Sequence, residues 1–269
     1  MPELPEVETT RRGVARVLEG RRLLEVVVRD SRLRWPVVVP DGLSGLRLIR
    51  LDRRAKYLIF RFSRVTVLIH LGMSGRLCVV SANMPAGKHD HVDFHFEDDQ
   101  VLRLSDPRRF GSIHFSTDPV ESHWLLKNLG PEPLGADFSG DYLHRVSRHR
   151  RQAVKTFIMS AQIVVGVGNI YANEALFRAG IRPGNAAGRI SKARYVELES
   201  AIRSTLEEAI AMGGTTLRDY VGSDGKPGYF IQELFVYGRD GKRCLQCETL
   251  LKGIRLGQRA TVYCPSCQR

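Results

Sequence analysis

The chain has 269 residues, with 41 Lys and Arg against 29 Asp and Glu, a formal net charge of +12 and a sequence pI near 9.8. This length predicts two domains with a small appendage and can bury a sizeable core, and the hydrophobic (43%) and charged (26%) fractions are ordinary for a soluble protein. We expect no membrane span, because no run approaches ~18 uninterrupted apolar residues, and no secretory signal. The basic balance favours a polyanionic partner such as nucleic acid, or only a solvated surface, and charge alone does not separate the two.

The N-terminal segment is predicted to form a helix over the first twenty residues. Its apolar positions recur at three-, four- and seven-residue spacings and so share one helical face; they are Leu4, Val7, Val14, Val17 and Leu18. Glutamates near the start of this segment favour the positive end of the helix dipole, and Gly20 can end the helix.

Residues 22–116 have a different pattern, with short β-rich runs that are separated by turn residues. The runs are LLEVVV, LRLIRL, YLIFRF, VTVLIHL, RLCVV, VDFHF, VLRL and SIHF. No helical stretch between them is long enough to cross over to a parallel neighbour. The pattern therefore favours an antiparallel sandwich or barrel over a parallel sheet.

The second half of the chain is expected to be largely helical. GPEPLG near 130 is typical of a linker, and helical patterns follow at about 141–160, 170–179 and 191–212. The segment 213–230 is rich in Gly, Ser, Thr and Asp and has no period, which predicts a long loop with a functional role. The last thirty residues form a basic module that contains four cysteines.

Four of the five cysteines stand in two C-x-x-C pairs, Cys244 with Cys247 and Cys264 with Cys267. Each C-x-x-C turn can bring two thiolates to one ion, and two such turns complete a closed tetrahedral shell. We therefore predict one structural zinc ion with no open position for a substrate, and a pair of disulfides is the less favoured alternative. Cys78 lies in an apolar strand and is expected to pack in the core.

Basic residues gather at two further places. The segment 252–263, between the cysteine pairs, alternates like a hairpin and carries Lys252, Arg255 and Arg259. Arginine can bind a phosphate through two hydrogen bonds, so this hairpin suits a nucleic-acid backbone, although a solvated edge strand has the same composition. A second cluster, with no acid between its members, consists of Arg145, Arg148, Arg150, Arg151 and Lys155.

The glycine turn 166–169 places N–H groups and a capping Asn169 before a helix, which favours an anion site or only an ordinary cap.

Longer motifs of this chain resemble, in the same order, those of the formamidopyrimidine-DNA glycosylases, a family of bacterial-type DNA repair enzymes. These motifs are MPELPEVET, RRAKYL, IHLGMSG, KHDHVDF, DPRRFG, LGPEP, VVGVGNIYANEALF, SDGKPGYF, VYGR and the terminal cysteine module. The resemblance runs from end to end. It implies a bifunctional glycosylase and AP lyase that excises oxidised purines, 8-oxoguanine above all, from duplex DNA.

The same resemblance implies an α+β multidomain fold. An N-terminal helix on an antiparallel two-layered β-sandwich is expected over 1–130, and a helical domain with a helix-two-turn-helix over 131–235. A four-cysteine zinc finger hairpin is expected over 236–269.

The resemblance assigns the chemistry to the start of the chain. Once Met1 is removed, Pro2 is a secondary amine whose attack on deoxyribose C1′ would give a cationic iminium and then allow elimination of the 3′ and 5′ phosphates. Glu3 is the expected general acid, and Glu6 and Glu174 resemble positions that support the active site. Outside this family, a helix that starts with proline and an acid is common.

The resemblance also implies which residues hold the DNA. Those expected at phosphates are Lys56, His70, His89, Asn169 and Arg259, of which Lys56 and Arg259 belong beside the reacting sugar. Met73, Arg108 and Phe110 match a triad that fills the gap left by an extruded nucleotide. The residues that resemble positions near the lesion are Lys155 and, in a lesion-capping loop, Thr215, Thr216 and Tyr220.

Two other functions stay open from the sequence. A sister branch that resembles endonuclease VIII excises oxidised pyrimidines, and Leu4 follows the pattern of the purine branch. A non-catalytic zinc-ribbon protein that reads duplex shape would share the basic clusters but would lack an amine nucleophile. We expect a monomer that acts on duplex DNA with oxidised purines or abasic sites, in the bacterial cytoplasm and associated with the nucleoid.

Overall fold

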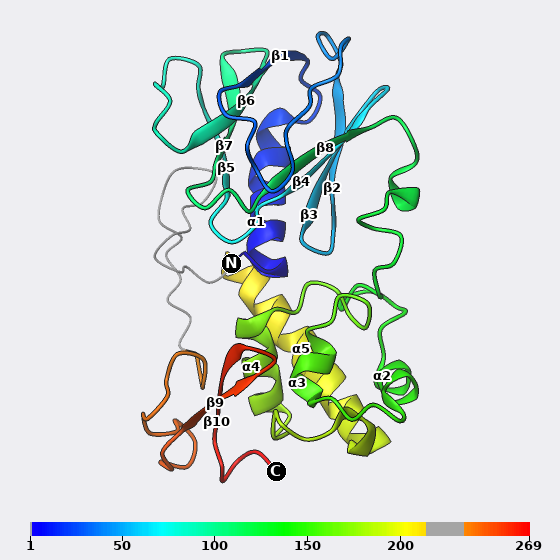
Figure 1. The fold of residues 1–269 in the computed structure, drawn as a ribbon, viewed down its shortest axis with the longest axis vertical. Helices are drawn as coiled ribbons and strands as arrows, with labels where there is room; N and C mark the ends of the chain where they lie inside the picture. The colour runs from blue at the N-terminus through cyan, green and yellow to red at the C-terminus, as the bar shows by residue number, and fades with distance from the viewer. Residues whose placement is uncertain (1, 214–233) are drawn as a thin grey trace. The chain divides into compact units, whose positions relative to one another are not determined.

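The computed structural model describes residues 2–213 and 234–269. Two compact units are present, an N-terminal unit (2–127) and a C-terminal unit (128–211 with 234–269) (Figure 1). Within the described residues, no helix has both the length and the apolar character that crossing a membrane requires. The three-part division at 130 and 235 stays a prediction.

Helix α1 (Leu4–Leu18) opens the N-terminal unit, as its periodicity predicts. A capping box fixes the start of the helix, because the Glu6 carboxylate accepts the backbone N–H of Glu3 at 2.8 Å. Most of the predicted apolar face is completely buried, namely Leu4, Val7, Val14 and Leu18, whereas Val17 is half-buried at the edge of the core. Gly20, at φ 86°, follows the helix in the left-handed region that favours glycine.

Two four-stranded antiparallel sheets complete the N-terminal unit, with the strand orders β1-β6-β7-β5 and β2-β3-β4-β8 (Figure 1). The strands are β1 (Leu23–Val28), β2 (Leu48–Arg54), β3 (Tyr57–Phe62), β4 (Thr66–His70), β5 (Arg76–Ser81), β6 (Asp90–Phe96), β7 (Gln100–Ser105) and β8 (Ser112–Ser116). Both sheets contribute to one core, for example through Phe60 of β3 and Phe94 of β6. The predicted antiparallel two-layer arrangement is confirmed.

The C-terminal unit is helical, but not in all the places that the sequence predicts. Its described helices are α2 (Gly140–Ser147), α3 (Val154–Ile158), α4 (Asn169–Arg178) and α5 (Lys192–Ala211), and the short 3-10 turns of the chain are η1 (Val120–Ser122) and η2 (Ala187–Arg189). The two later predicted helices are confirmed, whereas the stretch 141–160 is two short helices. The backbone turns away between them, because His149 has a φ of 64° and Ala153 pairs with Ala186.

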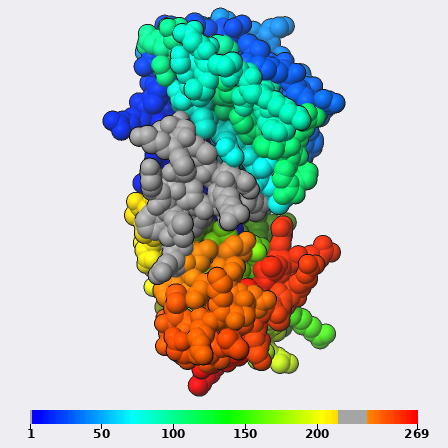
Figure 2. Space-filling model, turned by 90° about the vertical axis from the view of Figure 1, so that its left-hand side faces the viewer, coloured from blue at the N-terminus to red at the C-terminus, as the bar shows by residue number. Residues whose placement is uncertain are grey.

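The C-terminal segment folds into a hairpin of β9 (Lys252–Leu256) and β10 (Arg259–Tyr263), as the alternation predicts. Gly257 and Gln258 form its two-residue turn with positive φ values of 52° and 62°, the geometry that matches the twist of hairpin strands. Phe177 of α4 and Val262 of β10 share a small apolar core with buried cysteines of the module. Figure 2 shows this segment, in orange to red, as one continuous exposed lobe.

Both tryptophans of the sequence lie in one aromatic cluster of the N-terminal unit. Trp35 and Trp124 pack edge to face with ring centroids 5.4 Å apart, and His114 and His123 join them at 5.3 to 5.9 Å. The Arg34 guanidinium lies 4.6 Å from the centroid of the Trp35 ring, which is a cation-π contact. Burial lowers the pKa of both histidines, so the cationic charge of this cluster comes from Arg34 at neutral pH.

Candidate functional site

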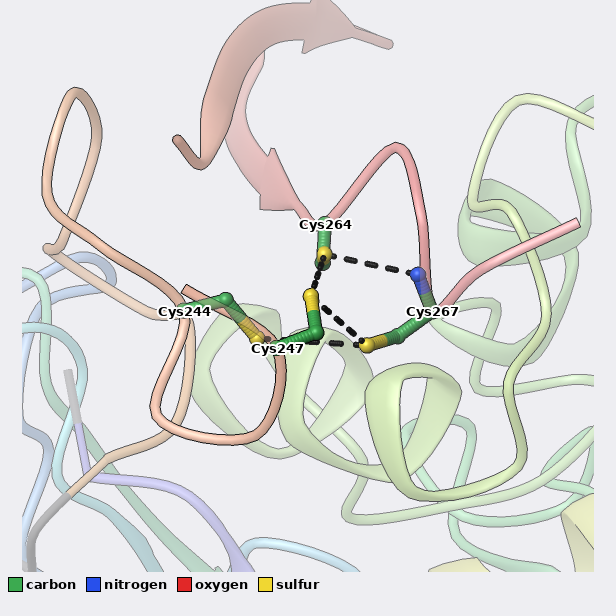
Figure 3. Close-up of side chains that lie close together, drawn as sticks. All are labelled: Cys244, Cys247, Cys264 and Cys267. Carbon is green, nitrogen blue, oxygen red and sulfur yellow. Dashed lines mark hydrogen bonds between the residues drawn. The ribbon is translucent and has the colours of Figure 1, made fainter. Parts of the chain in front are cut away.

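The C-terminal module brings the four predicted zinc ligands together (Figure 3). Cys244 and Cys247 come from one loop, Cys264 and Cys267 follow β10, and the four Sγ atoms lie within 4.8 Å of one another. All four are free thiols rather than disulfides. Sulfur–sulfur distances of 3.3, 3.4 and 3.9 Å are close to the ~3.8 Å between corners of a tetrahedron with Zn–S bonds of about 2.3 Å.

The chemistry of this donor set fits zinc. Backbone N–H groups of Gln246 and Cys267 point at the Sγ atoms of Cys244 and Cys264 at 3.5 and 3.4 Å. Burial, and then hydrogen bonds with the neighbouring thiols, raise the pKa of Cys267. The cofactor is therefore one structural zinc ion, which stabilises the module that carries the hairpin.

Two polar side chains of the helices hold the hairpin within the C-terminal unit. Lys155 of α3 is completely buried, and its Nζ donates to a carbonyl and to a hydroxyl of β10 at 2.9 and 2.7 Å. Asn173 of α4 accepts the backbone N–H of Val262 at 3.0 Å. Because these bonds lie along β10, they fix the exposed Arg259 at the start of that strand relative to α3 and α4.

Lys155 is expected near the lesion, which stays a prediction, and the structure places its ammonium against β10. Its ammonium points into the hairpin contact, so a direct bond to DNA would require this buried contact to open. A buried ammonium is stable only where it is hydrogen-bonded, so breaking this contact would be energetically unfavourable. The hydrogen bonds of Lys155 thus connect α3 to the hairpin.

Glu174 of α4 holds the segment that leads into the zinc module. Its carboxylate is 3% exposed and accepts the backbone N–H groups of Phe235, Val236 and Tyr237 at 2.8, 3.0 and 2.8 Å. Burial raises the pKa of Glu174, and the three N–H donors oppose that shift. Since both oxygens are engaged by backbone, this residue supports the site by positioning the module.

The glycine turn before α4 forms the predicted helix start, but with a different cap. Gly168 is the N-cap and Asn169 is the first helical residue, so the expectation that Asn169 caps the helix is wrong. The Asn169 Oδ1 is buried and has no hydrogen-bond partner among the described residues, while its carbonyl accepts Asn173 Nδ2 at 2.6 Å. The positive end of the dipole of this ten-residue helix faces the glycine turn, which suits an anion. Asn173 links this helix start to the Arg259 hairpin.

In the N-terminal unit, the start of α1 and Lys56 occupy the same end. Pro2 and Glu3 are buried, with Glu3 2% exposed. Glu8, in the next turn of the helix, accepts Arg53 Nε at 3.1 Å. Arg53 is the penultimate residue of β2, just before the turn that carries the half-buried Lys56, so this ion pair connects the helix start to that turn.

His70 ends β4 and lies across from Tyr57, with the ring centroids 4.8 Å apart. The Gly72 backbone N–H donates to His70 Nδ1 at 3.0 Å, so the neutral ring carries its proton on Nε2. Burial, and then the charges of Lys56 and Arg34, lower the pKa of His70 to about 4. At neutral pH this histidine is therefore an uncharged donor beside two cations, which suits a phosphate oxygen.

Met73, Arg108 and Phe110 lie on two adjacent turns, which we name the probe turn (71–75) and the wedge turn (107–111). Met73 is half-buried, Phe110 is 44% exposed, and the Arg108 guanidinium lies 5.0 Å from the Phe110 ring centroid. Gly72, at φ 62°, approaches the wedge turn so closely that a Cβ would fall 2.4 Å from the Phe110 carbonyl carbon. The structure thus brings the three residues of the predicted triad together.

Other expected DNA contacts are less concentrated. His89 is exposed just before β6. Arg148 of the basic cluster donates to the carbonyls of His144 and Ile190 at 3.0 and 2.9 Å, which makes it a structural residue that stabilises the end of α2. Three expected residues lie outside the described part of the chain, namely Thr215, Thr216 and Tyr220.

Sequence reasoning missed Asn173 and gave no physical ground to separate Arg108 from Arg109. Arg109 pairs with Asp30 at 2.7 Å, whereas the Arg108 guanidinium makes no ion pair among the described residues. Nothing in the letters DPRRF separates two neighbouring arginines. Asn173 did leave a signal, since it and Glu174 are polar residues on a buried stretch of helix that is mostly apolar.

Three family models together match most of the chain. Residues 1–113 match the formamidopyrimidine-DNA glycosylase N-terminal domain, and residues 129–221 match the formamidopyrimidine-DNA glycosylase H2TH domain. Residues 241–269 match a zinc finger found in FPG and IleRS.

Known relatives and solved structures resemble the chain over its full length. It is 57% identical to a formamidopyrimidine-DNA glycosylase of Alkalilimnicola ehrlichii and 59% identical to one of Stutzerimonas stutzeri, with all of each chain covered. A complex between a Lactococcus lactis FPG mutant and Fapy-dG containing DNA has a TM-score of 0.90, 32% identity and full coverage of both chains. The MutM (FPG) protein from Thermus thermophilus has a TM-score of 0.88 at 35% identity, covering 99% of this chain and 98% of that one.

Proposed function

The chain belongs to the formamidopyrimidine-DNA glycosylase family, and from that premise we propose that it excises oxidised purines from duplex DNA and cleaves the strand in base excision repair. The observation that carries this proposal is the match to that family from end to end at 57 to 59% identity. 8-Oxoguanine and formamidopyrimidines are the proposed substrates. The proposed location is the bacterial cytoplasm, on the nucleoid, where this substrate lies.

The nucleophile in this proposal is the secondary amine of Pro2, which removal of Met1 would free. Its nitrogen attacks C1′ of the damaged nucleotide, the glycosidic bond breaks, and the base leaves with one added proton. Opening of the sugar ring gives an iminium that has no N–H proton to lose and therefore stays cationic. Loss of a C2′ proton then expels the 3′ phosphate, and a second elimination expels the 5′ phosphate. Water finally adds to C1′ and restores the amine.

Glu3 is the proposed proton donor. It follows Pro2 directly, it is 2% exposed, and its backbone N–H is held by the Glu6 carboxylate. A carboxyl removed from water is suited to giving up a proton to a sugar oxygen or a departing base. The rigid start of α1 would keep this carboxyl beside the amine.

The remaining residues are proposed to hold the DNA. Lys56 and the Nε2 proton of His70 would bind a phosphate near the reacting sugar, and Arg259 and the start of α4 would bind others. Chemistry at C1′ requires the nucleotide to leave the stack, at a cost of a few kcal/mol. The side chains of the probe and wedge turns would fill the gap and offset part of this cost.

The decisive experiment is borohydride trapping combined with the intact mass of the active protein. A duplex with 8-oxoguanine opposite cytosine should give a covalent adduct that peptide mapping places on Pro2, in a protein that lacks Met1. Pro2→Gly should keep DNA binding but slow the trapping, and Glu3→Gln should abolish excision, whereas Glu25→Gln, at an exposed position of β1, should match the wild type. An adduct on another side chain, or an active enzyme that retains Met1, would falsify the mechanism.

The same assay separates the alternatives. Faster excision of oxidised thymine than of 8-oxoguanine would identify a pyrimidine-specific enzyme instead. Tight duplex binding without any trapped adduct would identify a protein that binds DNA without catalysis.

A further inference from the structure

One buried carboxylate joins the probe turn to the wedge turn. Asp106 is completely buried at the end of β7. Its Oδ1 accepts the Ser74 hydroxyl at 2.6 Å and the Arg108 backbone N–H at 3.3 Å, and its Oδ2 accepts the Gly111 backbone N–H at 2.7 Å. The Arg108 N–H also lies 3.2 Å from the Ser74 Oγ, so the two turns share a single small network.

The backbone of Asp106 extends the network to both sides. Its N–H donates to the His89 carbonyl at 2.9 Å, and its carbonyl accepts the Arg109 N–H at 3.2 Å and lies 2.8 Å from His91 Nε2. Arg109 is in turn held by its ion pair with Asp30 at 2.7 Å. Asp106 before the wedge turn and Arg109 within it are therefore anchored, while the Arg108 and Phe110 side chains stay exposed.

The two turns also touch directly, which couples their movements. A Cβ on Gly72 would fall 2.4 to 2.6 Å from backbone atoms of Phe110 and Gly111, and a Cβ on Gly111 would fall 3.0 Å from both Asp106 Oδ2 and the His70 carbonyl oxygen. Real Cβ atoms essentially never come within 3.0 Å of other heavy atoms. Glycine at these two positions therefore lets the turns pack backbone against backbone, and the Asp106 carboxylate is hydrogen-bonded to both.

We propose that Asp106 is the positioning residue for insertion into the DNA, an inference that rests on the proposed function. By accepting one hydrogen bond from the probe turn and two from the wedge turn, it makes the two turns a single rigid body. Met73, Arg108 and Phe110 then enter the duplex together, with their relative positions already set. Ordering them beforehand removes an entropy cost that separate flexible turns would incur while the stack is open.

Two variants test this proposal. One disturbs the hydrogen bonds to both turns, and the other removes only the bond to the probe turn. Asp106→Asn keeps the size of the side chain but replaces one acceptor oxygen with a donor, which would face a backbone N–H. Ser74→Ala removes only the hydroxyl that connects the probe turn, at a half-buried position with little risk to folding. Ser105→Ala is the matched control, because it also removes a hydroxyl bonded to a carboxylate, that of Asp90, but outside both turns.

The assay separates insertion from chemistry. A duplex with 8-oxoguanine and a neighbouring 2-aminopurine reports unstacking by fluorescence in stopped flow, without base excision. Lyase cleavage of a single-stranded abasic oligonucleotide reports the chemistry where there is no duplex stack to open. We expect the ratio of duplex excision to single-strand cleavage to fall about tenfold in Asp106→Asn and about fivefold in Ser74→Ala, with matching losses of the 2-aminopurine signal.

A ratio and a 2-aminopurine signal like those of the wild type in both variants would overturn the proposal. So would an equal fall in Ser105→Ala, since that would point to a general effect on the sheet. The fluorescence signal does not depend on catalysis, so it decides the role of Asp106 even if the chain excises no purine. If the chain excises no purine but the fluorescence signal falls in both variants, the proposed function fails and the positioning role of Asp106 still holds.

Discussion

Glu174 offers the sharpest test of how the zinc module is held to the helices. Glu174→Gln preserves the shape of the side chain and removes its charge. The retained oxygen can still accept two of the three backbone N–H groups, those of Val236 and Tyr237. The new NH2 group would then face the N–H of Phe235, so that one hydrogen bond is replaced by a contact between two donors.

The size of the effect follows from these contacts. Hydrogen bonds to a charged group contribute about 1.5–3 kcal/mol each, and neutral ones about half as much. Loss of one such bond and weakening of the other two should lower the free energy of unfolding of the C-terminal unit by about 2–4 kcal/mol. This estimate applies because Glu174 is almost fully buried, so water cannot replace the missing partner.

Zinc release in urea measures this loss. With a chromophoric chelator present, the urea concentration at the midpoint of zinc release should fall by about 1–2 M in Glu174→Gln. This conversion takes the free energy of unfolding to decrease by about 2 kcal/mol per M of urea. Glu208→Gln is the control in the same unit, because Glu208 is 48% exposed in its pair with Arg178 and should cost less than about 1 kcal/mol. An unchanged midpoint in Glu174→Gln, or an equal fall in Glu208→Gln, would refute the reasoning.

Three further outcomes are expected. Arg259→Ala should weaken duplex binding and reduce the slope of log affinity against log salt by about 0.9, the share of one phosphate, and an unchanged slope in a binding titration would exclude that contact. Removal of zinc by a chelator should abolish DNA binding and the circular dichroism of the hairpin while the N-terminal strands persist, and zinc alone should restore both; restoration by magnesium would contradict a four-thiolate site. The free protein has a His70 pKa of about 4, and a phosphate at Nε2 raises the pKa of the bound state. Binding should therefore take up a proton and tighten between about pH 7 and about pH 5, and this gain should vanish in His70→Asn when affinities are measured across that range.

Much of the fold could be predicted because it depends on local spacing. Helix α1 and the eight strands of the N-terminal unit follow from the period of their apolar residues, which decides the side that faces the core. The break between α2 and α3 could not be predicted in this way. It depends on the pairing of Ala153 with Ala186 and on the positive φ of His149, and neither leaves a periodic trace in the sequence.

The same distinction separates the site residues: those defined by local spacing could be predicted, and those defined by distant contacts could not. The zinc ligands could be found because the geometry of one C-x-x-C turn is encoded within four residues. The role of Lys155 could not, since its partner Thr261 lies 106 residues away and a basic residue in a basic run resembles a solvated one. Asn173 similarly bonds to Val262, 89 residues away. Contacts of this kind are set by tertiary packing.

The pairing of Trp35 with Trp124 has a practical consequence for any optical study of this protein. All tryptophan fluorescence arises from one cluster in the N-terminal unit. The C-terminal unit and its metal module therefore contribute no tryptophan emission. Tryptophan fluorescence and the absorbance of a chromophoric chelator that binds released zinc can therefore follow the two units separately in the same cuvette. Coincident midpoints would show one cooperative transition, and separated midpoints would give each unit its own stability.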